Sequence, residues 1–511
     1  MENYKFKVVI FSLLIILLSV ILFYGIFGFS VSYLSEEEIK EDRKLEEDLI
    51  NYFKINNLDT VYDKVNNIYY YSVPENYEGQ KYTLKLELDS GYKYKILNHA
   101  TNIITVDYKK EYNIIIFNDK YYYETKIVLT NLPLVNVTTD SEITDNDTNA
   151  VFEYINPSNL DQIVNYNSKI KIRGATTKRY NKKSYKVEFY DKDFDKEKNV
   201  NISNFYYGST YILDAMFRDN SKVRNVFSTD LWNDIAKDFT NVDVYSEYVE
   251  LFINGEYIGL YAFTEPVNRK NLNLNKSSAN DTSVIIKANS EKIPEKGDQF
   301  KNILDDLYLD YEMKYPNDEE LFSISWEKIL NKLSDYYNED IEKTEENLNE
   351  ILDINNYIDV IIYNAFIDNT DNDMKKNNYF YLKNLSSKLY IQPWDMEFTF
   401  GLSFNEDAPY DFQKDMSKYN QIDFRIDNED ILKIKKLIIN RYWNLRRNVL
   451  SEANLVRLLD EYKNDLTKGA ARRDTKKWLE YDVEEEINDI EIWLKKRIKV
   501  FDNYIRSLEN E

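Results

Sequence analysis

Hydrophobic and polar positions change their spacing several times along this chain of 511 residues. Residues 8–29 form an almost unbroken apolar run, which is long enough to cross a bilayer core as a helix. Lys5 and Lys7 precede the run and an acidic stretch follows it, so the positive-inside rule places the N-terminus in the cytoplasm. We therefore expect residues 1–32 to form a cytoplasmic tip and a single-pass membrane anchor, with the bulk of the chain extracytoplasmic. A cleaved signal peptide, which would release a secreted protein, is the alternative.

Two segments with different periodicities follow the anchor. Residues 33–60 begin with a capping box and continue with apolar residues at helical spacing, which predicts a helical stalk. Residues 61–131 instead alternate apolar and polar side chains, with turn signals between short runs such as 82–88 and 112–117. This pattern is typical of a small β-sandwich.

The rest of the chain, residues 132–511, first shows strand patterns and then helical ones. The clearest strand signal is at residues 248–265, where Asn254-Gly255 joins two apolar runs as a type I′ hairpin. Helical spacing dominates four later stretches, namely residues 326–354, 431–450, 451–467 and 474–508. We therefore expect an α+β domain with a β-rich N-terminal part and a helical C-terminal part.

Composition excludes several kinds of chemistry. The net charge is −23, which argues against nucleic acid as a partner. The chain has no cysteine, one histidine (His99), and neither a GxGxxG nor a GxxxxGK motif. Thiol, Ser-His-Asp and histidine–metal chemistry and P-loop phosphate binding are therefore excluded. The remaining carboxylate, Lys, Arg, Asn and Tyr side chains suit metal-assisted phosphoryl transfer or glycoside hydrolysis.

An acidic loop between a helix and a hairpin is the first candidate site. An apolar helical run from residue 357 leads into aspartates and asparagines at 368–373, and two short strands follow at 378–382 and 389–392. If these strands pair as a hairpin, Asp373, Asn378 and Asp395 meet at one of its ends. Short oxygen-bearing side chains on a rigid edge suit a hard cation. The alternative is an ordinary Asn/Asp-rich loop that caps the helix.

A basic turn and strand at residues 173–189 form the second candidate site. Six basic residues gather there in an otherwise acidic protein, and Gly174 allows a tight turn whose backbone amides can hold an anion. Phosphate binding and a solvated strand edge are both open interpretations. Arg218 and Arg224 are further candidate partners for an anion or a carboxylate. Glu265, at the end of a strand, is a candidate to pair with a lysine as the Lys–Glu pair does in kinases.

Six motifs occur in an order that resembles the CotH-type spore coat protein kinases. They are LPLVNVTT, RGATTKRYNKKSYKVEF, RDNSKVRNVFSTDLW, YVELFINGEYIGLYAFTE, DNDMKKNNYFYL and YIQPWDMEFTFG. The resemblance covers roughly residues 132–508, with ARRD at 471–474 as part of the family's tail. It implies an atypical kinase-like fold and transfer of the γ-phosphate of ATP, with Mg²⁺ or Mn²⁺, to Ser/Thr of proteins of the cell surface or spore coat. A spore-coat location is thus an alternative to the membrane.

The resemblance also implies roles for individual residues. Asp373 would be the catalytic base, with Asp371 as the alternative, and Asp395 would hold the metal ion. The other implied contacts are metal or phosphate ligands at Asn378 and Glu397, and cofactor-binding residues at Arg173, Glu265, and either Lys183 or Lys186. Three departures from the family pattern occur, since Asn377 replaces a histidine, Glu397 replaces an aspartate and Thr176-Thr177 replaces a pair of serines.

Two hypotheses from other functional classes remain. A surface assembly protein with a catalytically degenerate kinase fold would account for the anchor and the β module. A glycosidase using Asp373 and Asp395 would account for the carboxylates, but it gives the basic strand no clear role.

Overall fold

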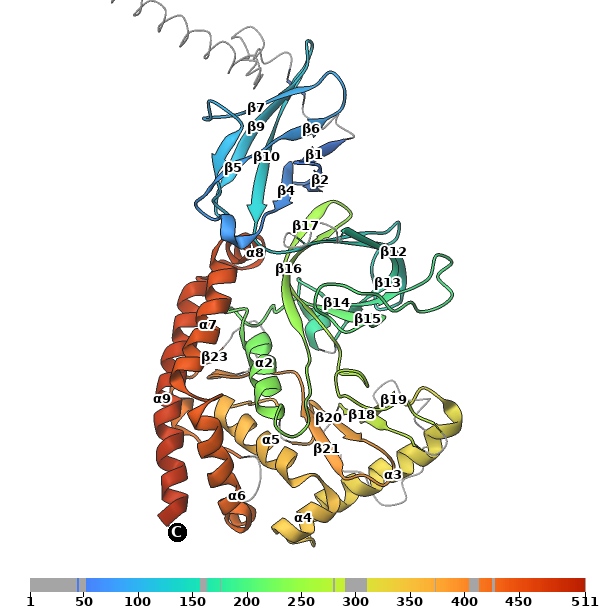
Figure 1. Cartoon of the computed structure of the whole chain (residues 1–511), viewed down its shortest axis with the longest axis vertical. Helices are drawn as coiled ribbons and strands as arrows, with labels where there is room; N and C mark the ends of the chain where they lie inside the picture. Colours follow the sequence, from blue (N-terminus) through green and yellow to red (C-terminus); the bar gives the residue numbers. More distant parts are fainter. Residues whose placement is uncertain are drawn as a thin grey trace, which may run out of the picture. The chain divides into compact units, whose positions relative to one another are not determined.

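The computed structural model describes residues 44–45, 52–156, 163–174, 176–278, 281–289, 310–372, 374–403, 413–424 and 428–510. The chain divides into two compact units, Met1–Leu129 and Thr130–Glu511 (Figure 1). The predicted anchor at residues 8–29 and most of the predicted stalk lie outside the described residues. None of the helices in these described ranges is long and apolar enough to cross a membrane.

The first unit is built from short β-strands. A five-stranded antiparallel sheet has the order β3-β4-β10-β9-β7, beside a three-stranded sheet β2-β1-β6 and a pair β5-β8. The strands are β1 (Phe53–Ile55), β2 (Leu58–Asp59), β3 (Val61–Asp63), β4 (Ile68–Ser72), β5 (Lys81–Thr83), β6 (Leu86–Leu88), β7 (Lys93–Ile96), β8 (Ile103–Thr105), β9 (Glu111–Phe117) and β10 (Tyr122–Thr130). One hydrophobic cluster contains residues of all three sheets, including Ile55, Ile104 and Ile114. The sandwich architecture itself stays a prediction.

The end of the predicted stalk is wrong, because residues 53–59 form a β-hairpin rather than a helix. Ile55 pairs with Leu58 across Asn56 and Asn57, whose φ angles of 53° and 66° are those of a type I′ turn. β1 also pairs along its length with β6. Pairing with a distant strand therefore overrides the helical spacing of this short segment.

The second unit begins with a closed barrel in the order β11-β12-β13-β14-β15-β17-β16. The strands are β11 (Leu134–Thr138), β12 (Thr148–Ile155), β13 (Ile163–Arg173), β14 (Ser184–Phe189), β15 (Thr210–Asp214), β16 (Ser246–Ile253) and β17 (Glu256–Thr264). Neighbouring strands are antiparallel except β11 and β16, which close the barrel in parallel. The predicted Asn254-Gly255 hairpin is confirmed, since Ile253 pairs with Glu256 and both turn residues have positive φ.

Alternation along these strands explains the barrel interior. Phe152, Phe189 and Phe263 are fully buried and their rings contact one another, with centroids 5.1 and 5.7 Å from that of Phe152. The residues directly before and after Phe152, Val151 and Glu153, are more exposed than Phe152, as the two-residue period of a strand requires.

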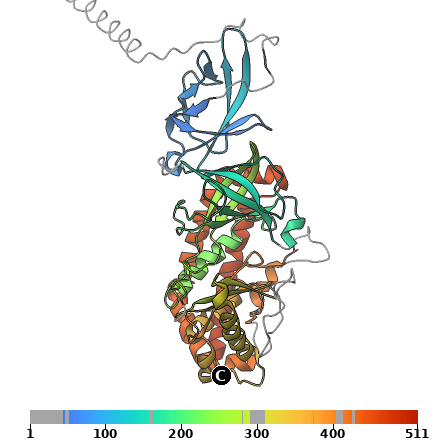
Figure 2. The same ribbon diagram turned by 90° about the vertical axis from the view of Figure 1, so that its right-hand side faces the viewer.

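A second, four-stranded antiparallel sheet has the order β19-β18-β20-β21. Its strands are β18 (Val284–Ala288), β19 (Tyr311–Tyr315), β20 (Asn378–Leu382) and β21 (Leu389–Pro393). The predicted hairpin is confirmed, because Asn378 pairs with Pro393 and Leu382 with Leu389. In both views of the molecule this sheet lies away from the barrel within the second unit, next to α3 and α4 (Figure 2).

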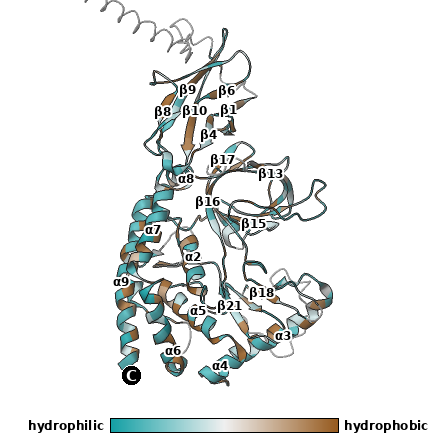
Figure 3. Cartoon of the chain, in the orientation of Figure 1, coloured by the Kyte–Doolittle hydropathy of each residue, from teal (hydrophilic) through white to brown (hydrophobic). Residues whose placement is uncertain are grey.

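Helices complete the second unit. They are α2 (Arg224–Ala236), α3 (Glu319–Tyr337), α4 (Glu345–Ile351), α5 (Ile354–Ile367), α6 (Asn428–Arg447), α7 (Glu452–Thr467), α8 (Ala470–Trp478) and α9 (Val483–Asn510). α5 is buried along nearly its whole length, and it packs on β21, α2 and α6. Teal and brown alternate along α7 and α9 in Figure 3, as expected for helices with one face on the core. The long helix predicted from residue 474 is instead divided between α8 and α9.

Candidate functional site

The end of the β20–β21 hairpin carries Asp395. The backbone N–H of Asn377 donates to Ala288 O at 3.2 Å, and that of Trp394 donates to Asn377 O at 2.9 Å. β18, β20 and β21 are thus held together immediately before Asp395. Asp395 itself has a φ of 62°, an unusual conformation for a residue other than glycine. Such backbone strain clusters at functional sites, where the surrounding structure enforces it.

The predicted amide ligand beside this aspartate is engaged within its own loop. The buried Asn378 and Asn372 form a reciprocal pair, with Nδ2–Oδ1 distances of 2.9 and 3.0 Å. Asn377 Nδ2 donates to Asp371 Oδ2 at 2.8 Å, and Lys376 lies 3.2 Å from the other carboxylate oxygen. Asp373, the favoured catalytic candidate, lies outside the described residues.

A chain of hydrogen bonds joins this hairpin end to the barrel. Ser184 Oγ donates to Asp214 Oδ1 at 3.2 Å, and Asn225 Nδ2 donates to Asp214 Oδ2 at 3.1 Å. The backbone N–H of Met396 then donates to Asn225 Oδ1 at 3.2 Å. Asp214, at the end of β15, is therefore connected to the residue that follows Asp395. Sequence reasoning did not single out Asp214 or Asn225, although Asn225 lies within the RDNSKVRNVFSTDLW motif.

Desolvation and neighbouring carboxylates raise the pKa values of Asp395 and Glu397 at this junction. The surrounding protein raises the pKa of Asp395 by desolvation although its side chain is solvent-exposed, and Asp371 and Asp214 add to the effect. Burial also raises the pKa of Glu397 to about 8, with further contributions from Asp214 and Asp395. The site therefore carries more negative charge than its protein surroundings stabilise, and a bound cation would relieve this.

Three cationic side chains from three different elements compensate part of this charge. Arg173 ends β13, Lys287 lies in β18, and Arg218 lies between β15 and α2. Arg173 and Lys287 both lower the pKa of Asp395, while Arg218 lowers that of Glu397. The Arg218 guanidinium stacks 4.0 Å from the Phe398 ring centroid. Arg173 was predicted at this place, but Lys287 was not.

The other predicted cofactor-binding residues have different partners. Lys183 Nζ donates to Lys178 O at 2.7 Å, and Lys186 pairs with Glu188 at 2.7 Å. Glu265 is buried and accepts hydrogen bonds from the backbone N–H groups of Tyr206 and Tyr245. Its burial raises its pKa to about 7. The expected ion pair of Glu265 with one of these lysines is therefore wrong, because the strand order directs the three side chains to separate surroundings.

A buried lysine–aspartate pair exists elsewhere in the basic motif. Lys182 Nζ lies 2.7 Å from Asp474 Oδ1 and also donates to the carbonyl oxygens of Ala215 and Leu260. The two side chains are 0% and 1% exposed. Asp474 belongs to α8, so this pair ties the helix to the barrel. In the sequence, the two-residue period of a strand places Lys182 on the same side as Ser184, but it does not identify Asp474 as the partner of Lys182.

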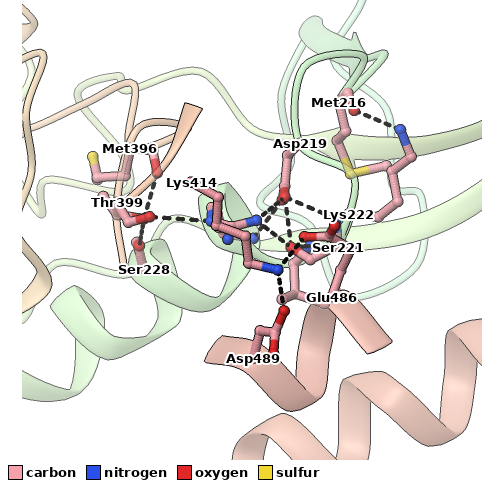
Figure 4. A network of polar contacts seen from close by, with 12 residues as sticks. Met216, Asp219, Ser221, Lys222, Ser228, Met396, Thr399, Lys414, Glu486 and Asp489 are labelled. Atoms are coloured by element: carbon pink, nitrogen blue, oxygen red, sulfur yellow. Dashed lines mark hydrogen bonds and ion pairs between the residues drawn. The ribbon is translucent and has the colours of Figure 1, made fainter. Parts of the chain in front are cut away.

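Arg224 pairs with a carboxylate, which is one of the two kinds of partner expected for it, and the pair has a structural role. Its guanidinium pairs with Asp219 at 2.6 Å, where both side chains are buried, and it donates through Nε to Thr399 O at 3.1 Å. Thr399 Oγ1 in turn donates to Met396 O at 3.0 Å. Figure 4 shows Thr399 beside Ser228 of α2 and Asp219 beside Ser221. This network holds the segment after Asp395 against α2.

The residues at this site can supply some, but not all, of the oxygen ligands that a hard divalent cation such as Mg²⁺ needs. Within the described ranges, no three acidic or histidine side chains converge on a metal position. Magnesium, however, is commonly held by one or two carboxylates together with water and substrate phosphates. Asp395 and Glu397 supply two mutually repelling carboxylates, and Asn378 Oδ1 has a second lone pair to offer.

Comparisons with known proteins address the family of this chain. A search of the curated proteins gave no match. The family model described as CotH kinase protein matches residues 170–501, which is well over half of the chain. This range begins within β13 and includes Arg173, both candidate sites and Asp474. The chain therefore belongs to the CotH kinase protein family.

Proposed function

We propose that the protein is a metal-dependent protein kinase that transfers the γ-phosphate of ATP to Ser or Thr side chains of other proteins. The observation that carries this proposal is the gathering of Asp371, Asp395 and Glu397 beside Arg173, within the range of the family match. Metal-bound phosphate transfer needs this combination of carboxylates for a cation and basic groups for the phosphates.

Asp395 and Glu397 are assigned to the metal ion, with Asn378 as a third oxygen ligand. The ion, Mg²⁺ or Mn²⁺, would neutralise charge on the phosphates of ATP. The substrate hydroxyl oxygen forms a bond to the γ-phosphorus as the bond to the leaving ADP oxygen breaks. The hydroxyl proton passes to an aspartate, Asp373 or Asp371. Asp371 is held in position by Asn377 and Lys376.

The apolar run at residues 8–29 supports a place for this activity outside the cytoplasm, on a single-pass anchor. The substrates would then be proteins of the cell surface or the spore coat. With a net charge of −23, the chain is not suited to nucleic acid.

Phosphate transfer tests the proposal. The purified protein is incubated with γ-labelled ATP, Mg²⁺ or Mn²⁺, and a Ser/Thr-rich protein substrate. Loss of a metal-binding carboxylate in Asp395→Asn should reduce the transfer rate by about a thousandfold or more, equivalent to roughly 4 kcal/mol of transition-state stabilisation. Glu461→Gln, which removes an exposed carboxylate from α7, is the matched control and should retain full activity. Equal transfer by the wild type and Asp395→Asn contradicts the proposal.

A catalytically degenerate assembly protein is the second candidate. The reciprocal Asn372–Asn378 pair favours it, because it occupies the amide that the kinase hypothesis assigns to the metal site. Nucleotide binding separates the two functions. A nucleotide at a hundred times its Kd should stabilise the protein by about 2.7 kcal/mol in the presence of metal. A scaffold would show no stabilisation with any nucleotide.

A further inference from the structure

Two cationic side chains approach Asp395 from opposite elements of the second unit. Arg173 comes from the barrel and Lys287 from the four-stranded sheet. Each belongs to a separate set of hydrogen bonds, and the two sets end on the two residues that flank Asp395. This arrangement suggests a role for Lys287 that its sequence context, a short apolar strand, does not reveal.

The first set starts at Lys287. The next residue, Ala288, pairs with Asn378 in the sheet and accepts a hydrogen bond from Asn377 N at 3.2 Å. Asn377 O then accepts from Trp394 N at 2.9 Å, and Asp395 follows directly. Lys287 is thus separated from Asp395 by one strand of a hydrogen-bonded sheet, where neighbouring strands lie about 5 Å apart.

The second set starts at Arg173. Arg173 pairs with Ser184 at the end of the β13–β14 hairpin, and Ser184 Oγ donates to Asp214. Asn225 then links Asp214 to the backbone of Met396, as described above. The barrel therefore positions Arg173 on the Met396 side of Asp395, whereas the sheet positions Lys287 on the Trp394 side.

The charges of these groups agree with this placement. Burial lowers the pKa of Lys287. The charge of Asp395 opposes this shift, and the like charge of Arg173 adds to it. No ion pair joins Arg173 or Lys287 to a carboxylate at salt-bridge distance among the residues that the structure describes. Lys183 and Lys186, by contrast, have their ammonium groups bound to Lys178 O and Glu188. Asp395 and Glu312 both act on Lys287, but Glu312, which is opposite Lys287 in the sheet, is paired with Lys314. Two neighbouring cations that make no ion pair of their own are suited to bind an anion.

We propose that Arg173 and Lys287 form a two-sided clamp for the phosphate chain of a nucleoside di- or triphosphate, with Lys287 in the role that the sequence assigned to Lys183 or Lys186. The identity of the ligand as a nucleotide rests on the proposed function, but the clamp itself rests on the positions of the two cations. A phosphate chain offers separate oxygens to each side chain, and it would offset their mutual repulsion. The clamp also links the barrel to the sheet through the bound ligand.

Binding measurements with matched variants test this clamp. Titration calorimetry gives the Kd of the wild type, Arg173→Gln and Lys287→Met for ATP, ADP and inorganic tripolyphosphate, with adenosine as the phosphate-free probe. Lys183→Met and Lys186→Met are the controls, since each removes one positive charge from the same motif. We expect Lys287→Met and Arg173→Gln each to weaken ATP and tripolyphosphate binding at least tenfold and to leave adenosine unaffected. The controls should change Kd by less than threefold.

The possible outcomes separate the phosphate clamp from the proposed kinase function. Equal weakening by Lys186→Met and Lys287→Met would overturn the clamp while leaving the kinase proposal intact. Binding of tripolyphosphate without ATP would keep the clamp and refute a nucleotide-dependent function. Failure of the wild type to bind either ligand would overturn both. Urea unfolding followed by tryptophan emission confirms that each variant is folded, because all six tryptophans lie in the second unit.

Discussion

Replacing Asp474 by Asn removes the negative charge from a buried pair that joins α8 to the barrel. Asp474 Oδ1 lies 2.7 Å from Lys182 Nζ and accepts a hydrogen bond from Leu260 N at 2.9 Å, and Lys222 lies 3.7 Å from the other carboxylate oxygen. Burial already lowers the pKa of Lys182 to about 8 against the opposing effect of Asp474. The variant would leave two buried lysines beside a neutral amide.

The size of the effect follows from the burial of the partners. Removing one member of a buried ion pair typically costs 3–5 kcal/mol, because the remaining charge has lost its hydration. We expect Asp474→Asn to lower the free energy of unfolding of the second unit by about this amount near pH 7. The loss should narrow as the pH rises toward about 8, because Asp474 raises the pKa of Lys182 and its removal lets the buried lysine give up its proton at a lower pH than in the wild type.

Urea unfolding of the full chain, followed by tryptophan emission, measures this loss in the second unit alone. Glu461→Gln breaks an exposed Arg457–Glu461 pair and should change stability by less than about 1 kcal/mol. The double variant Lys182→Met with Asp474→Leu should recover part of the lost stability, because the apolar side chains need no counter-charge and only Lys222 then lacks the Asp474 carboxylate. A loss below about 1 kcal/mol for Asp474→Asn would refute the assignment of this pair as a main attachment of α8.

Two other variants test neighbouring parts of the barrel. Gly259→Ala should lower the unfolding free energy by at least about 1–3 kcal/mol, because Gly259 has a φ of 132° and a Cβ there would lie 2.3 Å from Asp474 Oδ1; the same urea titration measures it, and wild-type stability would contradict the geometry. Burial raises the pKa of Glu247 to about 7, so its contribution to stability is complete below about pH 4.5 and is lost as the pH rises through 7. Glu247→Gln should therefore reduce the fall in unfolding free energy between pH 5 and pH 8.5 by at most about 3 kcal/mol, and an unchanged fall would show that Glu247 is not the titrating group.

Much of the local structure could be predicted because it is encoded over short distances. Two short strands around a polar turn predict the β20–β21 hairpin with the register that the structure shows, and this pairing places Asp395 at the hairpin end. Asn254-Gly255 predicts the turn between β16 and β17 from backbone preferences alone. Asn56-Asn57 carries a similar turn signal, but the helical spacing around it concealed the strand.

The electrostatic partners could not be predicted, because they depend on contacts between distant segments. Lys182 and Asp474 are separated by 292 positions, and each carries no local mark of its partner. Lys182 lies just before β14 and is buried, whereas Lys183 and Lys186 bind Lys178 O and Glu188. Lys287 lies in an apolar strand whose neighbours in the sheet come from residues 311–315 and 378–382. The closed barrel, with its parallel β11–β16 contact, is likewise a long-range feature.

In the proposed function, Asp395 holds a metal ion beside a nucleotide phosphate chain. A crystal structure of the protein with Mn²⁺ and a non-hydrolysable ATP analogue, with the anomalous signal of the metal, tests it most directly. If Asp395 holds the metal ion, we expect a manganese peak at bonding distance from its carboxylate and the phosphates between Arg173 and Lys287. A nucleotide bound elsewhere, or a metal ion without contact to Asp395, would contradict it.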